Sequence, residues 1–145
     1  MSVEQVARDF VANMTNEAKI KSMITPDAMA SGGVLPQAIP IMDSMKVVSG
    51  LTTAFPDFNL QVQQVTLNGN QATVRVTWGG TQSGPLDLMM PGTAAIPATG
   101  KKVSVKDAYI VTVVGDKVSH MEVISPADGG IPAALMQLGV HVPSM

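Results

Sequence analysis

The hydrophobic pattern of this 145-residue chain changes at Pro56. Before that proline, apolar residues recur every three or four positions, which is the spacing of one face of a helix. After it, apolar and polar residues alternate, which is the spacing of one face of a β-strand. Helices followed by a series of strands predict an α+β domain in which the helices cover one face of a curved antiparallel sheet.

Three helical segments are expected in the first part of the chain. Residues 3–14 carry an apolar stripe at helical spacing and predict the first helix. Residues 16–30 predict a short second helical piece, in which Pro26 either breaks the helix or opens its last turn. Apolar residues at helical spacing between positions 41 and 55 predict the third helix.

Two hairpins are expected in the second part of the chain. Asn68-Gly69 is the strongest short hairpin signal, and Gly115-Asp116 predicts a second tight turn. The strands that these turns join are residues 60–67, 73–78, 103–113 and 118–125. A short apolar segment, residues 133–138, follows the second hairpin.

Residues 79–100, between the two hairpins, predict neither helix nor strand and are rich in glycine and proline. An irregular connection of this length inside a compact domain is usually either a functional loop or a sign that the neighbouring elements are wrongly assigned. The segment carries large apolar side chains that would otherwise be exposed to water: Leu86, Leu88, Met89 and Met90. We therefore expect it to cover or rim the opening of a pocket.

Composition narrows the classes of protein to which the chain can belong. Only 14% of its residues are charged, against about 25% in an average soluble domain, while 46% are hydrophobic. We expect one domain over residues 1–145. Part of its uncharged surface is expected to lie in a pocket, or in the interface of a homodimer or higher homo-oligomer.

Several partners are not expected from the same data. A net charge of −2 without a basic cluster argues against nucleic acid. No apolar run approaches the roughly 20 residues that span a bilayer, and residues 1–5 lack a signal-peptide pattern, so we expect no membrane partner and a cytoplasmic location. Cysteine is absent, and His120 and His141 belong to no metal-ligand pattern, so no metal site is expected. The chain has no Walker loop and no dinucleotide-binding fingerprint, so no cofactor is expected.

Polar side chains on otherwise apolar strands are the candidate catalytic residues: Asp107, His120 and Glu122. Asp107 interrupts an apolar stripe, where a carboxylate is costly unless it is paired or faces a cavity. The alternatives are a strand-end residue in water or a local shift of register. His120 and Glu122 share one face of their strand and could form an acid/base pair. The alternative is that this face is solvated, with Met121 and Val123 pointing inward.

Counting back from the second turn places residues 107–109 opposite residues 121–122. We therefore expect Glu122 and His120 to face the interior, with Asp107 within reach on the neighbouring strand. A carboxylate in an apolar pocket could remove a proton next to a carbonyl group, with Glu122 or Asp107 as the base and His120 polarising the oxygen.

The remaining pocket candidates are aromatic, amide and methionine side chains. Methionine is flexible and suits adaptable apolar pockets, although the alternative for any single methionine is that it fills the core. Arg75, which shares a face with Thr73 and Thr77, predicts a solvated or interface stripe rather than a site. The expected pocket-lining residues are Trp78, Tyr109, Gln82, Met45, Met89 and Met90.

Several short segments occur in the order, and near the spacing, found in one known family. Together they resemble the SnoaL-like polyketide cyclases of the nuclear-transport-factor-two-like superfamily, a resemblance that extends over residues 3–140. It implies a cone-shaped, curved antiparallel sheet closed by N-terminal helices around an apolar pocket, and commonly a dimer or tetramer. The segments are Thr25-Pro26-Asp27, Ala54-Phe55-Pro56-Asp57-Phe58, Gly80-Thr81-Gln82-Ser83-Gly84, residues 97–103, residues 115–118 and Gln137-Leu138-Gly139.

The chain departs from the family at polar positions. The usual Gly-Thr-His is Gly80-Thr81-Gln82 here, and a frequent Glu-His-Trp run is replaced by His120-Met121-Glu122. Ser31 stands near the place of a histidine that usually follows the Pro-Asp segment. The polar side chains in the pocket are therefore expected to differ from those of the characterised members.

The resemblance implies one of two functions. Characterised members close a ring in a polyketide ester by an aldol-type reaction that needs no metal or cofactor. The first expectation is thus a cyclase-like or isomerase-like enzyme that performs acid/base chemistry on a small hydrophobic carbonyl compound. The second is a non-catalytic domain that binds a small hydrophobic ligand on the same scaffold, which the missing histidines favour.

Overall fold

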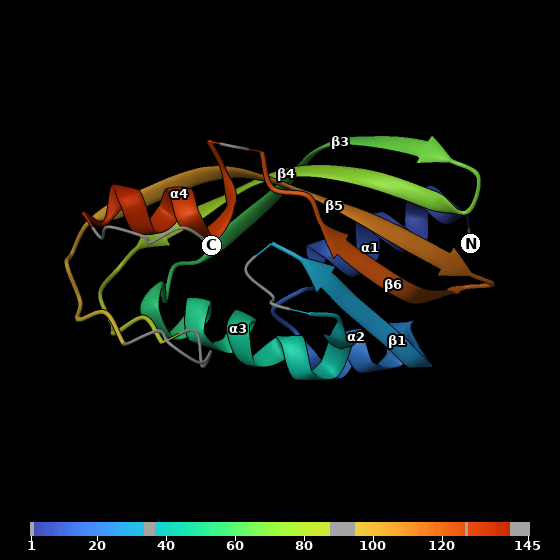
Figure 1. The fold of residues 1–145 in the computed structure, drawn as a ribbon, viewed down its shortest axis with the longest axis horizontal. Helices are drawn as coiled ribbons and strands as arrows, with labels where there is room; N and C mark the ends of the chain where they lie inside the picture. Colours follow the sequence, from blue (N-terminus) through green and yellow to red (C-terminus); the bar gives the residue numbers. More distant parts are fainter. Residues whose placement is uncertain (1, 34–36, 88–94, 127, 140–145) are drawn as a thin grey trace.

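A six-stranded curved sheet forms the framework of the molecule (Figure 1). The computed structural model describes residues 2–33, 37–87, 95–126 and 128–139. The strands are β1 (Ile24–Gly32), β2 (Ile39–Pro40), β3 (Asn59–Asn68), β4 (Gln71–Thr81), β5 (Lys102–Val114) and β6 (Lys117–Val123). They lie in the order β2-β1-β6-β5-β4-β3, and every neighbouring pair is antiparallel except β1 and β6, which are parallel.

Helices cover the inner face of this sheet and one of its ends. They are α1 (Val3–Ala12), α2 (Glu17–Met23), α3 (Ile41–Ala54) and α4 (Gly130–Gln137). Ser2 and Asn16 cap the first two helices, because their side chains accept hydrogen bonds from backbone N–H groups of the first turn. In Figure 1, α1 lies behind the strands and α3 runs along the lower side of the molecule. The predicted α+β arrangement with N-terminal helices is confirmed.

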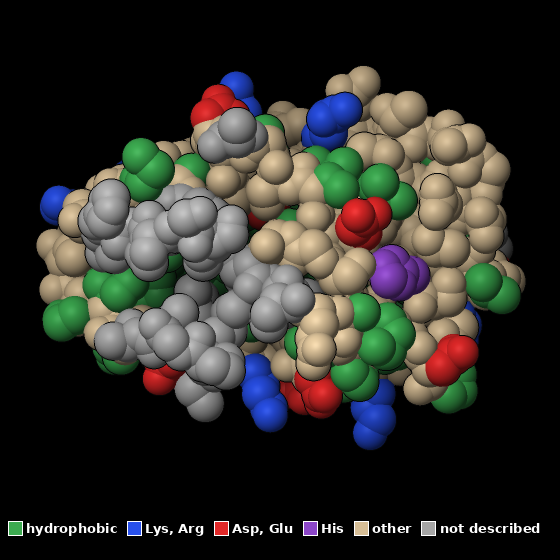
Figure 2. Space-filling view, viewed as in Figure 1, with side chains coloured by type: hydrophobic (Ala, Val, Ile, Leu, Met, Phe, Trp, Pro, Cys, Tyr) green, Lys and Arg blue, Asp and Glu red, His purple; other side chains and the backbone are tan. Residues whose placement is uncertain are grey.

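The core lies between α1 and the inner face of β4 and β5. Both strands alternate between buried inner residues and more exposed outer ones, as the period of two in their sequences predicts. The outer face is mostly uncharged and polar. Figure 2 shows few charged side chains on the face in view, and most of them lie near its rim. Core residues with almost no exposure include Val6, Phe10, Val74, Val76, Val103 and Val111.

The prediction that residues 16–30 are helical is wrong beyond Met23. Residues 24–32 form β1, which pairs with β6, a strand that lies about ninety residues later in the chain. Pro26 is tolerated because the pairing between β1 and β6 is interrupted between Ile24 and Met29, where no N–H group is required. Local spacing does not distinguish a short helix from a strand whose partner is distant.

Both predicted hairpins are confirmed, but the second contains a bulge. Val113 pairs with Val118, whereas Thr112 pairs with His120, so Ser119 is an extra residue in β6. One extra residue exchanges the faces of all residues beyond it, because side chains alternate along a strand. This bulge decides which residues of β6 face the interior.

The irregular connection between β4 and β5 is partly described. Leu86 is buried and forms an isolated antiparallel bridge with Ile96, so the segment folds back on itself. Leu86 belongs to the core rather than to a pocket wall. Leu88, Met89 and Met90 lie outside the described residues. In the described part of the chain, no helix combines the length and the apolar character needed to cross a bilayer.

The burial pattern of β5 generates a stability prediction. Val111→Ala should lower the free energy of unfolding by about 2 kcal/mol, because it removes methyl groups from a close-packed core. Val114→Ala removes the same atoms from a side chain that is 56% exposed, and should change it by less than about 0.5 kcal/mol. Urea unfolding of both variants measures the difference, and equal losses would contradict this placement of the strand.

Candidate functional site

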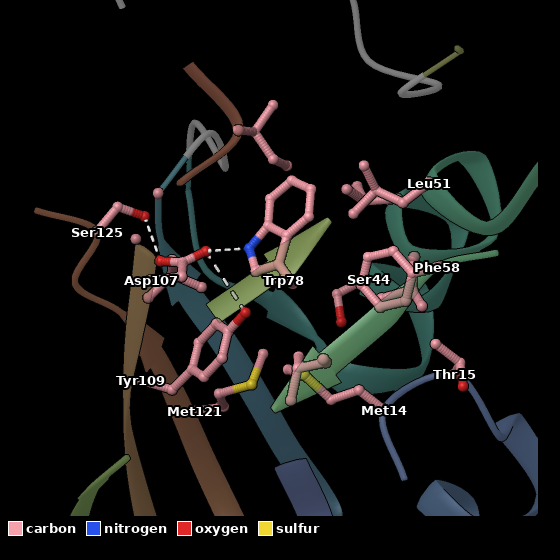
Figure 3. A pocket seen from close by; sticks show the side chains of 17 residues that line it. Met14, Thr15, Ser44, Leu51, Phe58, Trp78, Asp107, Tyr109, Met121 and Ser125 are labelled. Carbon is pink, nitrogen blue, oxygen red and sulfur yellow. Dashed lines mark hydrogen bonds between the residues drawn. The ribbon is translucent and has the colours of Figure 1, made fainter. Parts of the chain in front are cut away.

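A cavity of about 100 Å³ lies between α3 and the inner face of the sheet (Figure 3). The face of α3 that contains Ser44, Val48 and Leu51 forms one wall, since these residues recur at helical spacing. Side chains of β3 to β6 form the opposite wall. Asp107 is the one charged residue among the described residues that line the cavity. The 17 described residues that line the cavity are Met14, Thr15, Gly32, Gly33, Ser44, Val47, Val48, Leu51, Phe58, Leu60, Trp78, Asp107, Tyr109, Met121, Val123, Ser125 and Ile131.

The Asp107 carboxylate is 6% exposed and accepts hydrogen bonds on both oxygens. Oδ1 accepts from the Ser125 hydroxyl at 2.7 Å and from the Ala108 backbone N–H at 2.9 Å. Oδ2 accepts from the Trp78 indole N–H at 3.1 Å and from the Tyr109 hydroxyl at 3.4 Å. Figure 3 shows the Trp78, Tyr109 and Ser125 side chains pointing toward this carboxylate. These donors stabilise a negative charge that burial alone would disfavour.

Three neighbouring strands bring these groups together. Asp107 pairs with Val76 of β4, which places Trp78 on the same inner face two residues along. Tyr109 follows two residues later on β5 and therefore points to the same side. Ser125 lies just beyond the end of β6 and reaches the carboxylate from the other neighbouring strand. The cluster therefore depends on the registers of both β4 and β6 against β5.

Aromatic rings form much of the wall next to the carboxylate. The ring centroids of Phe58 and Trp78 are 5.7 Å apart, with the rings tilted by 33°. Burial raises the pKa of the Tyr109 hydroxyl well above its usual value of 10.0, and the negative charge of Asp107 and the hydrogen bond to it raise this pKa further. Tyr109 is therefore a protonated hydrogen-bond donor at neutral pH.

The expected interior placement of Glu122 and His120 is wrong. Glu122 is exposed, and neither residue lines the cavity; Met121 and Val123 line it instead. The cause is the bulge at Ser119, which a count from the turn without an extra residue does not include. His120 is half-buried on the other face, with its Nε2 2.8 Å from the Ser31 hydroxyl oxygen.

Among the expected pocket-lining residues, Trp78 and Tyr109 lie on the cavity wall and Gln82 and Met45 do not. Gln82 is fully buried, and its amide bonds to the connection between β4 and β5: Nε2 donates to the Ile96 and Pro97 carbonyls, and Oε1 accepts from Thr99. Gln82 therefore fixes that connection. Met45 packs against the core, but its place on α3 turns it away from the cavity-facing stripe. Met89 and Met90 lie outside the described residues.

Sequence reasoning missed Ser125 and Phe58 as members of the site. Ser125 becomes a neighbour of Asp107 only when the bulge is counted. The signal for that bulge is the spacing of the apolar residues of β6, because Val118 and Met121 are three positions apart where a regular strand would place them two or four apart. Phe58 precedes β3 and carries no signal of its own.

The described residues contain no group of three or more His, Asp or Glu side chains arranged to hold a metal ion. The side-chain polar groups that the described residues bring to the cavity wall are one carboxylate, hydroxyls and an indole N–H. Such a set can exchange a proton and donate hydrogen bonds to a neutral oxygen.

Comparisons with known proteins identify a family and a fold. The family model described as SnoaL-like polyketide cyclase matches residues 3–125. Among solved structures, a SnoaL-like polyketide cyclase homologue from Jannaschia sp. CCS1 is 19% identical with a TM-score of 0.75, covering 97% of this chain and 93% of the other. IdmH from Streptomyces antibioticus, described as a polyketide cyclase, is 19% identical with a TM-score of 0.73, covering 97% and 100%.

A third structure, an NTF2-like protein from Burkholderia thailandensis, is 14% identical with a TM-score of 0.70, covering 97% of this chain and 99% of the other. At these identities the solved structures show the fold alone. No match was found among curated protein sequences.

Tyr109 is the only tyrosine, so its titration can be followed directly. Its phenolate absorbance should appear only well above pH 10, and in Asp107→Asn it should appear at lower pH because the nearby charge is gone. Because the folded pKa is raised, the stability that the protonated hydroxyl contributes is complete below pH 10 and is lost as the pH rises toward the folded pKa. Tyr109→Phe should lack this alkaline loss. Phenolate absorbance near pH 10 in the folded wild type would contradict the buried placement.

Proposed function

Because the chain belongs to the SnoaL-like polyketide cyclase family, we propose that it performs cofactor-free acid/base chemistry of the cyclase or isomerase type on a small hydrophobic carbonyl compound. The observation that carries the proposal is a buried carboxylate, Asp107, on the wall of an otherwise apolar cavity. An apolar ligand gains from leaving water, and a carboxylate beside it can accept a proton from a carbon next to a carbonyl group.

The proposed base is Oδ2 of Asp107. The two hydrogen bonds to Oδ2, at 3.1 and 3.4 Å, are longer than those to Oδ1, at 2.7 and 2.9 Å. Oδ2 therefore keeps more capacity to accept a proton. The proton leaves the carbon next to the ligand carbonyl and is bound by Oδ2, while the bonding electrons move to the carbonyl oxygen as an enolate. At the end of the reaction Oδ2 gives its proton to the product, at a carbon in an isomerisation or at the new alkoxide oxygen in a ring closure, which restores the carboxylate.

Tyr109 is the proposed donor to the enolate oxygen. Its hydroxyl is 3.4 Å from Asp107 Oδ2, which is long for an O–H···O hydrogen bond. If the hydroxyl hydrogen rotates toward a ligand oxygen, only this weak hydrogen bond is lost. A hydrogen-bond donor that points at a developing negative charge stabilises the transition state more in a water-free cavity than it would in water. The raised pKa of Tyr109 keeps this donor protonated. Trp78 and Ser125 hold the carboxylate in place.

One observation favours a second candidate, a non-catalytic domain that binds a small hydrophobic ligand. Both oxygens of Asp107 already accept two hydrogen bonds each. A carboxylate whose hydrogen bonds are all made within the protein can have a purely structural role, which is to hold the side chains of the cavity wall in place. The two candidates differ in whether a bound carbonyl compound exchanges protons.

Proton exchange tests the proposal without knowledge of the natural substrate. The wild type should accelerate deuterium incorporation into ethyl benzoylacetate, a small aromatic β-keto ester, as followed by NMR in D₂O. Asp107→Asn should reduce this acceleration about 100-fold or more, the usual contribution of a general base. Glu122→Gln is the matched control: the same type of change on the exposed face should leave exchange unchanged. Tyr109→Phe should reduce the rate without abolishing binding.

Two results would separate the candidates. Saturable binding of the β-keto ester, measured by quenching of the single tryptophan, without any protein-dependent exchange would favour the binding domain. Loss of exchange in Glu122→Gln with full exchange in Asp107→Asn would place the chemistry on the other face of β6 and contradict the proposal.

We also propose that the chain forms a homodimer through the outer face of the sheet, since that face is mostly uncharged. Thr73 lies on it, facing Thr66 and Ile110 on the neighbouring strands. Thr73→Glu should convert the dimer to a monomer at micromolar concentration by placing a charge in the interface. Ala12→Glu, on the exposed side of α1, should leave the dimer intact. Light scattering measures both, and a monomeric wild type would refute the proposal.

A further inference from the structure

The charge of the cavity is negative and has no cationic partner within the described residues. Asp107 is buried, its hydrogen-bond donors are a backbone N–H, two hydroxyls and an indole N–H, and no Lys, Arg or His is among the described residues that line the cavity. These neutral donors supply partial positive charges only. Buried carboxylates are usually compensated by a full positive charge, from an ion pair or a metal ion.

The walls around this charge suit a particular kind of cation. Trp78, Tyr109 and Phe58 surround the cavity with aromatic rings, and Met14 and Met121 add polarizable thioethers. Aromatic faces attract positive charge, and alkyl groups attached to nitrogen lose little hydration when they enter an apolar site. A hydrated inorganic ion would find too few oxygen ligands here, whereas an alkylated ammonium needs none.

We propose that the cavity binds a small alkylammonium group, with its positive charge opposite Asp107 and its alkyl groups against Trp78, Tyr109 and Phe58. The inference rests on the proposed function only in using the same cavity, and it does not require the acid/base reaction. It identifies the charge of the ligand: cationic amines are accepted, and carboxylates and phosphates are rejected, because an anion would meet Asp107 without a compensating group.

Oδ2 is the oxygen available to such a ligand. Oδ1 is held at 2.7 and 2.9 Å by Ser125 and Ala108, while Oδ2 has the 3.4 Å contact to Tyr109 as its weakest bond. The cavity, of about 100 Å³, is of the order needed for a trimethylammonium group. A cation near Oδ2 would occupy the space in which the proposed base meets the carbonyl compound. An amine should therefore also inhibit proton exchange, by competition with that compound.

The test compares two ligands of the same shape. Choline carries a trimethylammonium group, and 3,3-dimethylbutan-1-ol replaces its nitrogen with carbon and is neutral. Calorimetry on the full chain should show choline binding about tenfold or more tightly than the alcohol. In Asp107→Asn the preference for choline should fall about fivefold or more, because only the contribution of the aromatic rings remains. In Glu122→Gln, whose charge lies outside the cavity, the wild-type preference should remain.

A second variant keeps the inference testable if Asp107→Asn does not fold. Phe58→Leu retains the carboxylate and an apolar wall but removes one ring, and should lower the preference for choline about threefold or more. Equal binding of the two ligands to the wild type, binding of neither, or an undiminished preference for choline in Asp107→Asn would overturn the inference. Selective choline binding without proton exchange would support the alkylammonium site and refute the catalytic proposal. Proton exchange without selectivity for choline would support the catalytic proposal and refute the alkylammonium site.

Discussion

The desolvation of one carboxylate constrains the centre of this structure. Moving an ionised group from water into an apolar interior costs several kcal/mol, and only hydrogen bonds or opposite charge offset that cost. Asp107 obtains its hydrogen bonds from three separate places: Trp78 on β4, its own strand β5, and Ser125 beyond β6. At about 1.5–3 kcal/mol for each bond to a charged group, four donors are of the right order to balance burial. Strands β4, β5 and β6 must therefore keep one relative register.

The bulge in β6 makes that register possible. With Ser119 as an extra residue, Tyr109 pairs with Val123, and the chain continues so that Ser125 reaches Asp107. Without the bulge, Ile124 would stand opposite the carboxylate and would offer no hydroxyl, and Glu122 would turn inward beside a second negative charge. The same bulge places Met121 and Val123 on the cavity wall, so a single inserted residue determines both the satisfaction of Asp107 and the apolar character of the cavity.

Family membership and site chemistry are separate levels of description. The fold is shared with solved structures at 14–19% identity, because curved sheets closed by helices tolerate wide changes in side chains. The polar residues at which this chain departs from the family, Gln82, His120 and Glu122, lie away from the cavity, and only Met121 between the last two lines it. Gln82 instead anchors the connection between β4 and β5, and His120 bonds to Ser31 on the opposite face. The polar groups of the cavity wall are therefore supplied by other residues, among them Asp107, Tyr109 and Ser125.

The sequence by itself determined the elements whose information is local. Apolar spacing located α1 and α3, the hairpin turns located β3 to β6, and the order of helices before strands determined the α+β class. Asp107, Trp78 and Tyr109 could be selected because they interrupt or complete an apolar stripe on neighbouring strands. Only the tertiary structure decided that residues 24–32 form a strand, which face of β6 points to the interior, and which groups bond to Gln82. Strand pairing joins residues far apart in the chain, and one extra residue reverses a face, so no local pattern carries this information without the partner strand.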